Sequence, residues 1–443
     1  MITMQIKEAS ILVLILTITN TKCSDIVVAG FKKIPHLEFT STISSLSDLA
    51  DILHNKTNLN IVLIDNQEVS VLPNRSLANV TLENFHMVNC GLKDIEPGAL
   101  DSANISNLKF PYNDIEAIKK GVFGYRVFGM IFLNENKISS IEGGAFEGMV
   151  ANGLDLSSNR LTKLSESMFD YSTISQLVLS HNDISEIESS TLRKITGLTY
   201  INLDGNKLET VGDIFENLTN LTDILLNSNR IKVLCPGVFK GTSLTRISLG
   251  QNNLSVVHQG VFNNLPLELI DFSGNQITTI EAGAFFNVST KTRKLQALQL
   301  DHNNISSIDP GTFGQLIVNE LSLSHNNLTT VNKEMFEGAD INILSLQENQ
   351  ISTIELGAFR GVKINWFVDL SGNTVLDNLI LVNLESTEFI LKKKHGYRIL
   401  SLQDFNRSNS SMSTSQNILE IPNERHFPVT SEEVNLNVVN GDF

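Results

Sequence analysis

The sequence predicts an α/β repeat solenoid, in which one short strand from each repeat adds to a single long parallel sheet. Three observations indicate this fold: a pattern that recurs about every 23 residues, an alternation of apolar and polar residues within each copy, and a phenylalanine at a fixed place in most copies. A unit of this size cannot bury a core alone, so successive copies must stack. We therefore expect a horseshoe with the parallel sheet on its concave side.

The recurring segment has the form apolar-x-apolar-x-x-Asn-x-apolar, as in Leu154, Leu156, Asn159 and Leu161. Successive Asn positions lie 23 or 24 residues apart, with one interval of 28 residues. This period predicts a leucine-rich repeat array of about 14 repeats between residues 61 and 380. The Asn position is called the ladder position below, and it is occupied by Asn66, Cys90, Asn113, Asn136, Asn159, Asn182, Asn206, Asn229, Asn252, Asn275, Asn303, Asn326, Asn349 and Asn373.

Each position of the repeat has a physical role. The apolar pair before the ladder position alternates with polar residues, which predicts a strand with one buried face. The Asn side chain is expected to turn inward and to satisfy backbone groups where the strand ends, with Cys90 substituting at one rung. Ten residues later comes a buried aromatic spine, formed by Phe123, Phe146, Phe169, Phe239, Phe262, Phe285, Phe313, Phe336 and Phe359.

These repeats resemble the extracellular leucine-rich repeats of Toll-type receptors, Slit and the acid-labile subunit, especially in the Gly-x-Phe turns at 144–146, 283–285 and 357–359. The resemblance covers about residues 59 to 380 and implies an extracellular binding module. More narrowly, residues 45–72 and the two weak repeats after them are similar to secreted arthropod repeat proteins such as the non-catalytic subunit of crustacean luciferin monooxygenase. Unlike the first group, the chain lacks cysteine-rich caps at both ends of the array.

The N-terminus predicts a signal peptide over residues 1–23, because Lys7 precedes an apolar run from Ile11 to Ile18. Cleavage is expected after Thr21 or Cys23, and an N-terminal strand is the alternative. No later stretch is apolar enough to span a membrane, so we expect a secreted, extracellular protein. Asn-x-Ser/Thr sequons agree with that; they stand at Asn55, Asn74, Asn79, Asn104, Asn217, Asn220, Asn253, Asn287, Asn304, Asn327, Asn406 and Asn409.

The ends of the array need polar covers, since end repeats otherwise expose their core. We assign residues 24–60 to an N-terminal cap, with Leu46, Leu49, Ile52 and Leu53 at helical spacing, and residues 381–405 to a C-terminal cap. Residues 406–443 begin with a Ser/Asn-rich run and are predicted to be a mostly disordered tail. The 28-residue interval places a loop insertion between Phe285 and Leu298, which is either a tolerated insertion or a contact site.

Two cysteines of the array are predicted to stay apart. Cys90 and Cys235 lie six repeats from each other, roughly 29 Å at the spacing of parallel strands, whereas a disulfide allows about 7 Å between Cα atoms. Cys235 stands at an outward slot. It is predicted to be either a free or capped thiol, or the site of an intermolecular disulfide that makes a homodimer or a heteromer.

The outward side chains of the sheet are the candidate ligand-binding face. The slots one, two, four and six residues before the ladder position hold more carboxylates than cations, namely Asp223 and Glu348 in addition to the candidates below, against Lys109 and Arg246. Exposed aromatics including Phe367 are expected among them. The candidate binding residues are Phe132, Asp155, Tyr200, Asp204, Asp271, Asp301, Glu320 and Asp369; the alternative is a solvated face without function.

The formal net charge of −15 argues against nucleic acid and anionic membrane as partners. It favours a protein ligand with a basic segment. His302 and His325 fall in neighbouring repeats, but two ligands make a poor metal site. With no catalytic motif, no cofactor is expected and the chain is predicted not to be an enzyme. A structural matrix component, or a non-catalytic accessory subunit of a secreted enzyme complex, is the alternative to a binding module.

Overall fold

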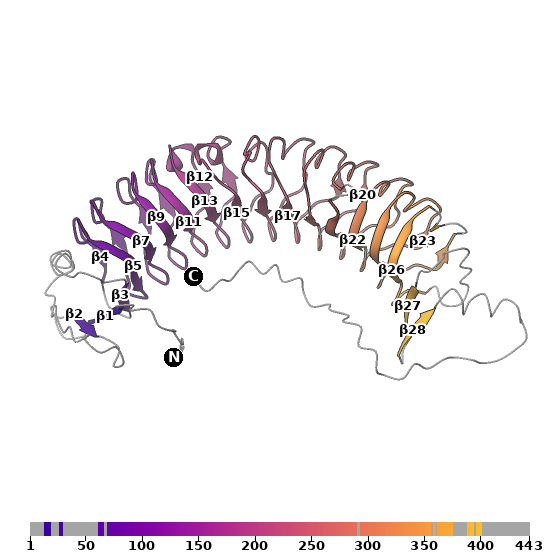
Figure 1. The fold of residues 1–443 in the computed structure, drawn as a ribbon, viewed down its shortest axis with the longest axis horizontal. Coiled ribbons are helices and arrows are strands. Elements are labelled where there is room, and N and C mark those ends of the chain that lie inside the picture. Colours follow the sequence, from indigo (N-terminus) through magenta and orange to yellow (C-terminus); the bar gives the residue numbers. More distant parts are fainter. Residues whose placement is uncertain are drawn as a thin grey trace, which may run out of the picture. The chain divides into compact units, whose positions relative to one another are not determined.

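The computed structural model describes residues 69–289, 293–355, 358–359 and 361–374, together with the backbone of strands at 13–18, 26–29, 61–65, 388–393 and 396–400. One strand from each of the fourteen repeats joins a parallel sheet, each paired with the strand of the next repeat. Figure 1 shows these strands along the inner side of a curved array. They are β3 (Ile61–Asp65), β5 (Thr81–Val88), β7 (Asn104–Lys109), β9 (Val127–Phe132), β11 (Val150–Asp155), β13 (Thr173–Val178), β15 (Tyr200–Asn202), β16 (Asp223–Leu225), β17 (Arg246–Ser248), β19 (Leu269–Asp271), β21 (Leu295–Gln299), β22 (Ile317–Ser322), β24 (Asp340–Ser345) and β26 (Lys363–Asp369).

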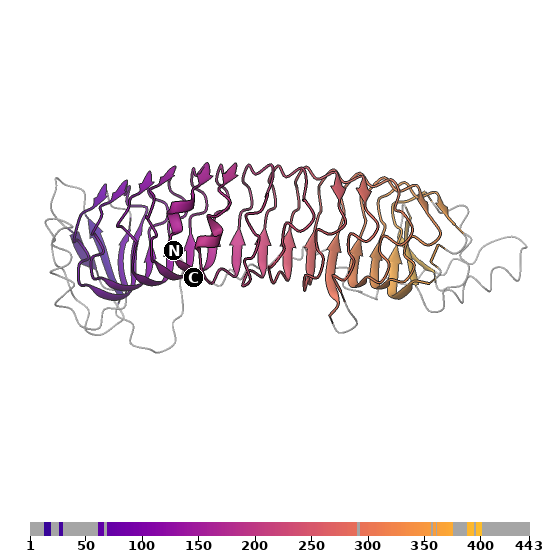
Figure 2. The ribbon, with the colours of Figure 1, turned by 90° about the horizontal axis from the view of Figure 1, so that it is seen from above.

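The opposite side of the array consists of turns, two-residue strands and two short 3₁₀ helices, η2 (Glu166–Phe169) and η3 (Leu192–Lys194). No α-helix occurs in the described residues, so the solenoid and its parallel sheet are confirmed while its outer side has almost no helix. Figure 2 shows the small strands above the main sheet. They form the pairs β4 (Val71–Leu72) with β6 (Asp94–Ile95), β8 (Ala117–Ile118) with β10 (Ser140–Ile141), β12 (Lys163–Leu164) with β14 (Glu186–Ile187), β18 (Val256–Val257) with β20 (Thr279–Ile280), and β23 (Thr330–Val331) with β25 (Thr353–Ile354).

A continuous apolar core lies between these two sides. The predicted phenylalanine spine is confirmed, because all nine side chains are buried and neighbouring rings stack with centroids 5.4 to 6.4 Å apart. Phe215 extends the spine by contacting Phe239 at 6.0 Å. The sequence pattern missed Phe215 because it follows its ladder residue by nine positions rather than ten.

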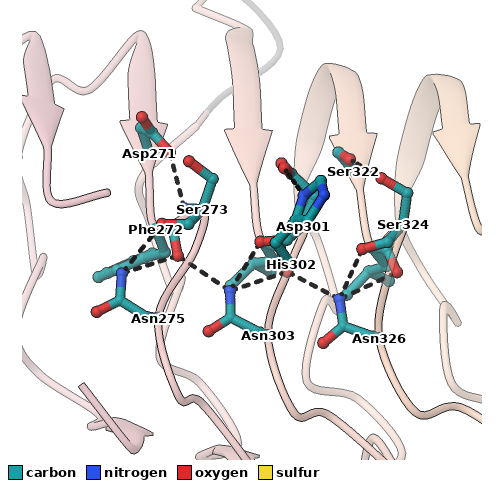
Figure 3. A network of polar contacts seen from close by, with 12 residues as sticks. Asp271, Phe272, Ser273, Asn275, Asp301, His302, Asn303, Ser322, Ser324 and Asn326 are labelled. Atoms are coloured by element: carbon teal, nitrogen blue, oxygen red, sulfur yellow. Dashed lines mark hydrogen bonds and ion pairs between the residues drawn. The ribbon is translucent and has the colours of Figure 1, made fainter. Parts of the chain in front are cut away.

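The asparagine ladder is the second structural element that joins the repeats. At a typical rung, Asn303 Nδ2 donates to the carbonyls of Leu300 and Asp301 in its own repeat and to Phe272 in the preceding one, at 3.0 to 3.1 Å. Its Oδ1 accepts the N–H of Ile277 at 2.9 Å. Figure 3 shows the same amide arrangement at successive rungs. The ladder prediction is confirmed from Asn113 to Asn373, whereas Asn66 lies outside the described residues.

The loop insertion falls where the spacing predicted it. Phe285 still stacks on Phe313, and Leu298 still pairs with Ile270, so the extra residues lie between Phe285 and Leu298. Arg293 is half-buried and lies near the Leu265 carbonyl, while Lys294 is exposed.

Four further strands extend the main sheet. β1 (Val13–Ile18) pairs in parallel with β3 and antiparallel with β2 (Ile26–Ala29). At the other end, β27 (Glu388–Lys393) pairs in parallel with β26 and forms an antiparallel hairpin with β28 (Gly396–Leu400). β1 lies inside the segment predicted as a signal peptide and matches the alternative of an N-terminal strand; processing of that segment stays a prediction. The helical spacing at residues 46–53 and the tail from residue 406 lie outside the described residues.

The described residues contain no helix long and apolar enough to cross a membrane.

Candidate binding face

The eight predicted binding residues stand on the outward face of the sheet, and all of them are half-buried. The aromatic members differ from the prediction, which had them exposed. Lys109 explains this at Phe132, since its Nζ lies 5.0 Å from the centre of the Phe132 ring. Burial lowers the pKa of Lys109 and raises the pKa of Tyr200. These side chains therefore form the floor of the face and not projecting anchors.

Three predicted carboxylates have a structural role at the ends of their strands. Asp155, Asp271 and Asp369 each accept the backbone N–H of the serine two residues later, at 2.8 to 2.9 Å. This is the Asx-turn arrangement, in which a short side chain replaces a backbone acceptor. For Asp155 and Asp369 the contact accounts for the residue without any ligand.

The three remaining carboxylates, together with Asp271, form a charged stripe. We define the acidic stripe as Asp204, Asp271, Asp301 and Glu320. Burial raises the pKa of Asp204 to about 6, and it also raises the pKa values of Asp271 and Glu320. Repulsion between members adds to each of these shifts, from Asp271 onto Asp204 and from Asp301 onto Asp271 and Glu320. The stripe is thus a run of mutually repelling charges in a poorly solvated place.

Asp223 does not belong to this stripe, contrary to its place in the sequence-based count. It is 8% exposed and forms an ion pair with Arg246 on the neighbouring strand. Its second oxygen accepts the Thr222 hydroxyl at 2.6 Å. In the part of the chain whose side chains are described, Asp204, Asp271 and Glu320 form no such pair with lysine or arginine.

Backbone geometry explains why histidine stands directly before three of the ladder positions. The residue before each ladder position has a positive φ throughout the described repeats, including His181, His302 and His325 at 51° to 55°. Histidine, like asparagine, is enriched in this left-handed region. The His302 and His325 rings stack with their centroids 4.2 Å apart. His302 Nδ1 lies 2.9 Å from Asp301 Oδ2, as Figure 3 shows. No group of three His, Cys, Asp or Glu side chains that could hold a metal ion occurs in the described residues.

Trp366 is an exposed aromatic residue that the slot pattern missed. It is the only tryptophan of the chain and is 60% exposed. A β-bulge causes this, because the register between β24 and β26 shifts and Trp366 has no partner between Ile343↔Phe367 and Ile341↔Ile364. Bulges re-aim side chains in this way. Phe367, which was predicted to be exposed, is half-buried beside it.

A row of hydrogen-bonded asparagine side chains on the outward face of the sheet was also not predicted from the sequence. Asn342 Nδ2 donates to Asn319 at 2.9 Å and Asn365 Nδ2 donates to Asn342 at 2.7 Å. The recurrence of Asn every 23 residues at 319, 342 and 365 was the available signal. These amides bond to each other along the sheet, so they are part of the framework.

The sequons lie away from the candidate binding slots. None of the twelve occupies the positions one, two, four or six residues before a ladder position. The nine on residues with described side chains are all exposed: Asn74, Asn79, Asn104, Asn217, Asn220, Asn253, Asn287, Asn304 and Asn327. Asn55, Asn406 and Asn409 lie outside those residues. The sequons therefore do not occupy the slots that hold the acidic stripe.

We predict that Asn253, Asn304 and Asn327 carry glycans in protein made by a secreting eukaryotic host. Each is exposed one residue after a buried ladder asparagine, so a glycan there does not disturb the core. Glycopeptide mass spectrometry is the measurement. All three sites unmodified would count against either the repeat register or secretion of this chain.

The two described cysteines have opposite environments, as predicted. Cys90 is buried and Cys235 is exposed, and no disulfide joins the two. If Cys23 leaves with the signal peptide, we predict that any reductant-sensitive dimer or heteromer of secreted protein disappears in Cys235→Ser and persists in Cys90→Ser, because Cys235 is the exposed one of the two remaining cysteines. Non-reducing electrophoresis measures this. A band at monomer mass alone for the parent protein would leave Cys235 as a free or capped thiol.

Comparison with known proteins agrees with this architecture. The family model described as BspA type leucine rich repeat region matches residues 15–127, 130–234 and 162–292, and the leucine rich repeat model matches residues 293–340 and 318–375. Among curated proteins, no relative matches the chain by sequence.

Two solved structures of the Toll–Spatzle complex show the same fold. Toll in the Drosophila Toll–Spatzle complex is similar with a TM-score of 0.55 in its glycosylated form, at 20% identity over 67% of this chain and 42% of that one. A second structure of the complex gives 0.53, at 19% identity over 68% and 45%. The leucine-rich repeat domain of APL1B has a TM-score of 0.49, at 17% identity over 71% and 82%. This chain thus spans less than half the length of the Toll chains. By its family matches, its ladder and its parallel sheet, the chain belongs to the leucine-rich repeat proteins.

Proposed function

We propose that this chain is a secreted leucine-rich repeat protein that binds a protein ligand through the outward face of its sheet. In this proposal the acidic stripe holds a basic segment of the ligand. The observation that carries it is the run of half-buried carboxylates Asp204, Asp271 and Glu320, which form no ion pair with lysine or arginine among the described side chains. A cation placed beside such carboxylates lowers their free energy.

Two further observations support a ligand on this face. The sequons leave its slots free, and charge complementarity speeds and orients association. Toll, whose fold is similar, was solved in a complex with Spatzle. Solenoids commonly bind through the extended surface that their stacked repeats create.

Secretion is part of the proposal. It is supported by the apolar segment near the N-terminus and by the exposure of all nine sequons with described side chains. Membership of a complex as an accessory subunit, or of a matrix, remains the second candidate. The exposed Cys235 thiol favours that candidate, because it offers a site for covalent assembly in an oxidising compartment.

Binding of basic peptides tests the proposal. A fluorescein-labelled twelve-residue peptide of alternating lysine and serine should bind the full chain, and a matched glutamate–serine peptide should not, as read by fluorescence anisotropy at low salt. The triple variant Asp204→Asn, Asp271→Asn, Glu320→Gln is expected to lose at least about tenfold in affinity, equivalent to about 1.4 kcal/mol. Raising the salt should weaken binding to the parent.

The matched control removes three exposed carboxylates from outside the sheet, in Glu116→Gln, Asp309→Asn, Glu337→Gln. It changes the net charge equally and should bind within about twofold of the parent. Equal loss in both triple variants would show attraction to overall charge and not to the acidic stripe. No binding of the lysine–serine peptide to the parent would refute the basic-segment proposal.

A further inference from the structure

Lys109 differs from the other cations of the described chain. It stands in the outward slot four residues before the ladder position, at the end of β7, and it is half-buried. Apart from Arg293, which lies near the Leu265 carbonyl, every other lysine or arginine with a described side chain is either exposed or paired with a carboxylate. Lys109 forms no such pair with any described carboxylate.

The Phe132 ring is the contact that positions the Lys109 ammonium. Phe132 occupies the same slot of the next repeat, and Lys109 Nζ lies 5.0 Å from the ring centre. An aromatic face attracts a cation more weakly than a carboxylate does. Burial lowers the pKa of Lys109, because the ammonium has lost hydration without gaining a counter-ion.

The groups around Lys109 leave its charge uncompensated. His86, in register with Lys109 on β5, has its pKa lowered to about 4 by burial and by Lys109 itself, so it is neutral at neutral pH. Its Nε2 has no hydrogen-bond partner in the described structure but is shielded from solvent, so Lys109 and not His86 is the group that a ligand can reach. Asp155 lies two repeats beyond Lys109, with Phe132 between them, and it already accepts the Ser157 N–H and hydroxyl at 2.8 and 2.6 Å.

The remaining outward slots at this end of the face are uncharged. At the positions two, four and six residues before the ladder, the repeats of β5, β7 and β9 carry, besides Lys109 and the neutral His86, only Asn84, Val88, Asn107, Pro111, Met130, Phe132 and Asn134. Two of the amides bond to each other, because Asn107 Nδ2 donates to Asn84 Oδ1 at 3.0 Å. The face is therefore bipolar, with one cation among uncharged slots at β7 and the acidic stripe further along the array.

We propose that Lys109 is a subsite for one carboxylate of the protein ligand, and that this contact fixes the direction in which the ligand lies along the face. The inference rests on the proposed function, in which the acidic stripe holds a basic segment. A carboxylate would give the ammonium the counter-ion that it lacks. One ammonium beside a neutral histidine balances a single negative charge, which suits a carboxylate better than a phosphate group of nearly two charges. Water screens a half-buried pair less than an exposed one.

The separation of the two sites sets the geometry of the ligand. Lys109 and Asp204, the first member of the acidic stripe, belong to repeats four steps apart. At the spacing of parallel strands this is roughly 19 Å, which an extended peptide covers in about six residues. We therefore expect the ligand to carry an acidic residue about six positions from its basic segment.

Peptides that differ in one terminal residue test the subsite. The lysine–serine peptide is extended by five glycine and serine residues and one glutamate, at the N-terminal end in one peptide and at the C-terminal end in another. Matched peptides end in glutamine, and all have blocked termini so that no other carboxylate is present. In at least one direction the glutamate peptide is expected to bind the full chain about fivefold more tightly than its glutamine counterpart, as read by anisotropy. The net charge of −15 alone would produce the opposite order.

Variants of Lys109 separate its charge from its packing. Lys109→Met removes the charge and keeps an apolar stem on Phe132, so it should bind the glutamate and glutamine peptides equally. Lys109→Arg keeps the charge and should retain the preference for glutamate, which a role of the stem alone would not explain. Lys93→Met is the matched control, since it makes the same change at an exposed lysine outside the main sheet, and it should also retain the preference.

Equal binding of the glutamate and glutamine peptides by the parent, in both directions, would overturn the subsite. A preference for glutamate that survives in Lys109→Met would also overturn it. The comparison of peptides on the parent decides the matter even if Lys109→Met fails to fold. If the acidic-stripe triple variant still loses the lysine–serine peptide in these cases, the proposed function stands without the subsite. No binding of any of these peptides to the parent would refute both.

Discussion

Asn252→Leu is expected to lower the free energy of unfolding by about 3 kcal/mol. Its side chain accepts the buried N–H of Ile231 at 2.9 Å and donates to Leu226, Leu249 and Gly250 at 2.8 to 3.2 Å. Leucine can make none of these bonds. Stranding one buried N–H alone costs about 1 to 3 kcal/mol, and the loss of three donated bonds adds to it.

The carbonyls limit the damage, because each has a second donor. Leu226 O also accepts from Asn229, Leu249 O from Asn275, and Gly250 O from the Ser228 N–H. The unpaired group in the variant is therefore the Ile231 N–H. This is why we expect about 3 kcal/mol and not the sum of four bonds.

Urea unfolding of protein made in a non-glycosylating host measures the effect. Asn253→Leu is the matched control, since it makes the same chemical change one residue away at an exposed site. It should change stability by less than about 0.5 kcal/mol. Equal unfolding midpoints for Asn252→Leu and the parent would contradict the structural role of the ladder.

The Cys90 rung shows how the fold accommodates the loss of an amide. At this rung the Val69 N–H has the position that the Ile231 N–H has at the Asn252 rung. It donates to the Cys90 backbone carbonyl at 2.8 Å. The thiol itself donates to Val88 O at 3.3 Å. The sequence pattern predicted that the thiol would substitute for the amide as a donor, but it could not show that a backbone carbonyl takes over as acceptor.

Period and slot were sufficient to predict the ladder, the spine and the outward face, because each depends on the repeat alone. Burial on the face depends on which residue occupies the same slot one repeat away. Arg246 neutralises Asp223 and Lys109 covers Phe132 in this manner. In each pair the two residues occupy the same slot of neighbouring repeats. A comparison of residues 23 positions apart in the sequence could therefore have predicted both contacts.

The bulge at Trp366 could not be located from the sequence. The interval from Asn349 to Asn373 is 24 residues and signals one extra residue without placing it. The interval from Asn182 to Asn206 is also 24, but there the extra residue lies before the strand pair, between the Thr173↔Thr196 bridge and the Gln176↔Tyr200 register. The packing of the whole repeat decides at which position the extra residue is inserted.

Asp204→Asn is expected to stabilise the protein at neutral pH by about 3 kcal/mol. Burial raises the pKa of Asp204 from 3.8 to about 6, and each unit is worth about 1.36 kcal/mol of preference for the neutral form. Asparagine keeps an oxygen that can accept the Asn227 N–H, and it carries no charge.

The pKa values of Asp204 in the folded and unfolded states determine how the stability difference between variant and parent changes with pH. Between about pH 4 and pH 6 the folded state binds the Asp204 proton while the unfolded state has released it, so the parent loses stability as the pH rises through this window. Below pH 4 the carboxyl is neutral in both states and resembles the amide. The difference between Asp204→Asn and the parent should therefore be near zero at pH 3.5, grow between pH 4 and 6, and stay constant above pH 7.

Urea unfolding at several pH values measures this difference, with Asp309→Asn as the control for removing one negative charge at an exposed site. The same variant should bind the lysine–serine peptide more weakly. If Asp204→Asn is more stable than the parent but binds the peptide more weakly, Asp204 serves binding and destabilises the folded state. If Asp204 instead had a structural role, the variant would be less stable than the parent. A constant or negative stability difference across the pH range would show that Asp204 is adequately solvated, and would remove the electrostatic argument for a cationic ligand at this position.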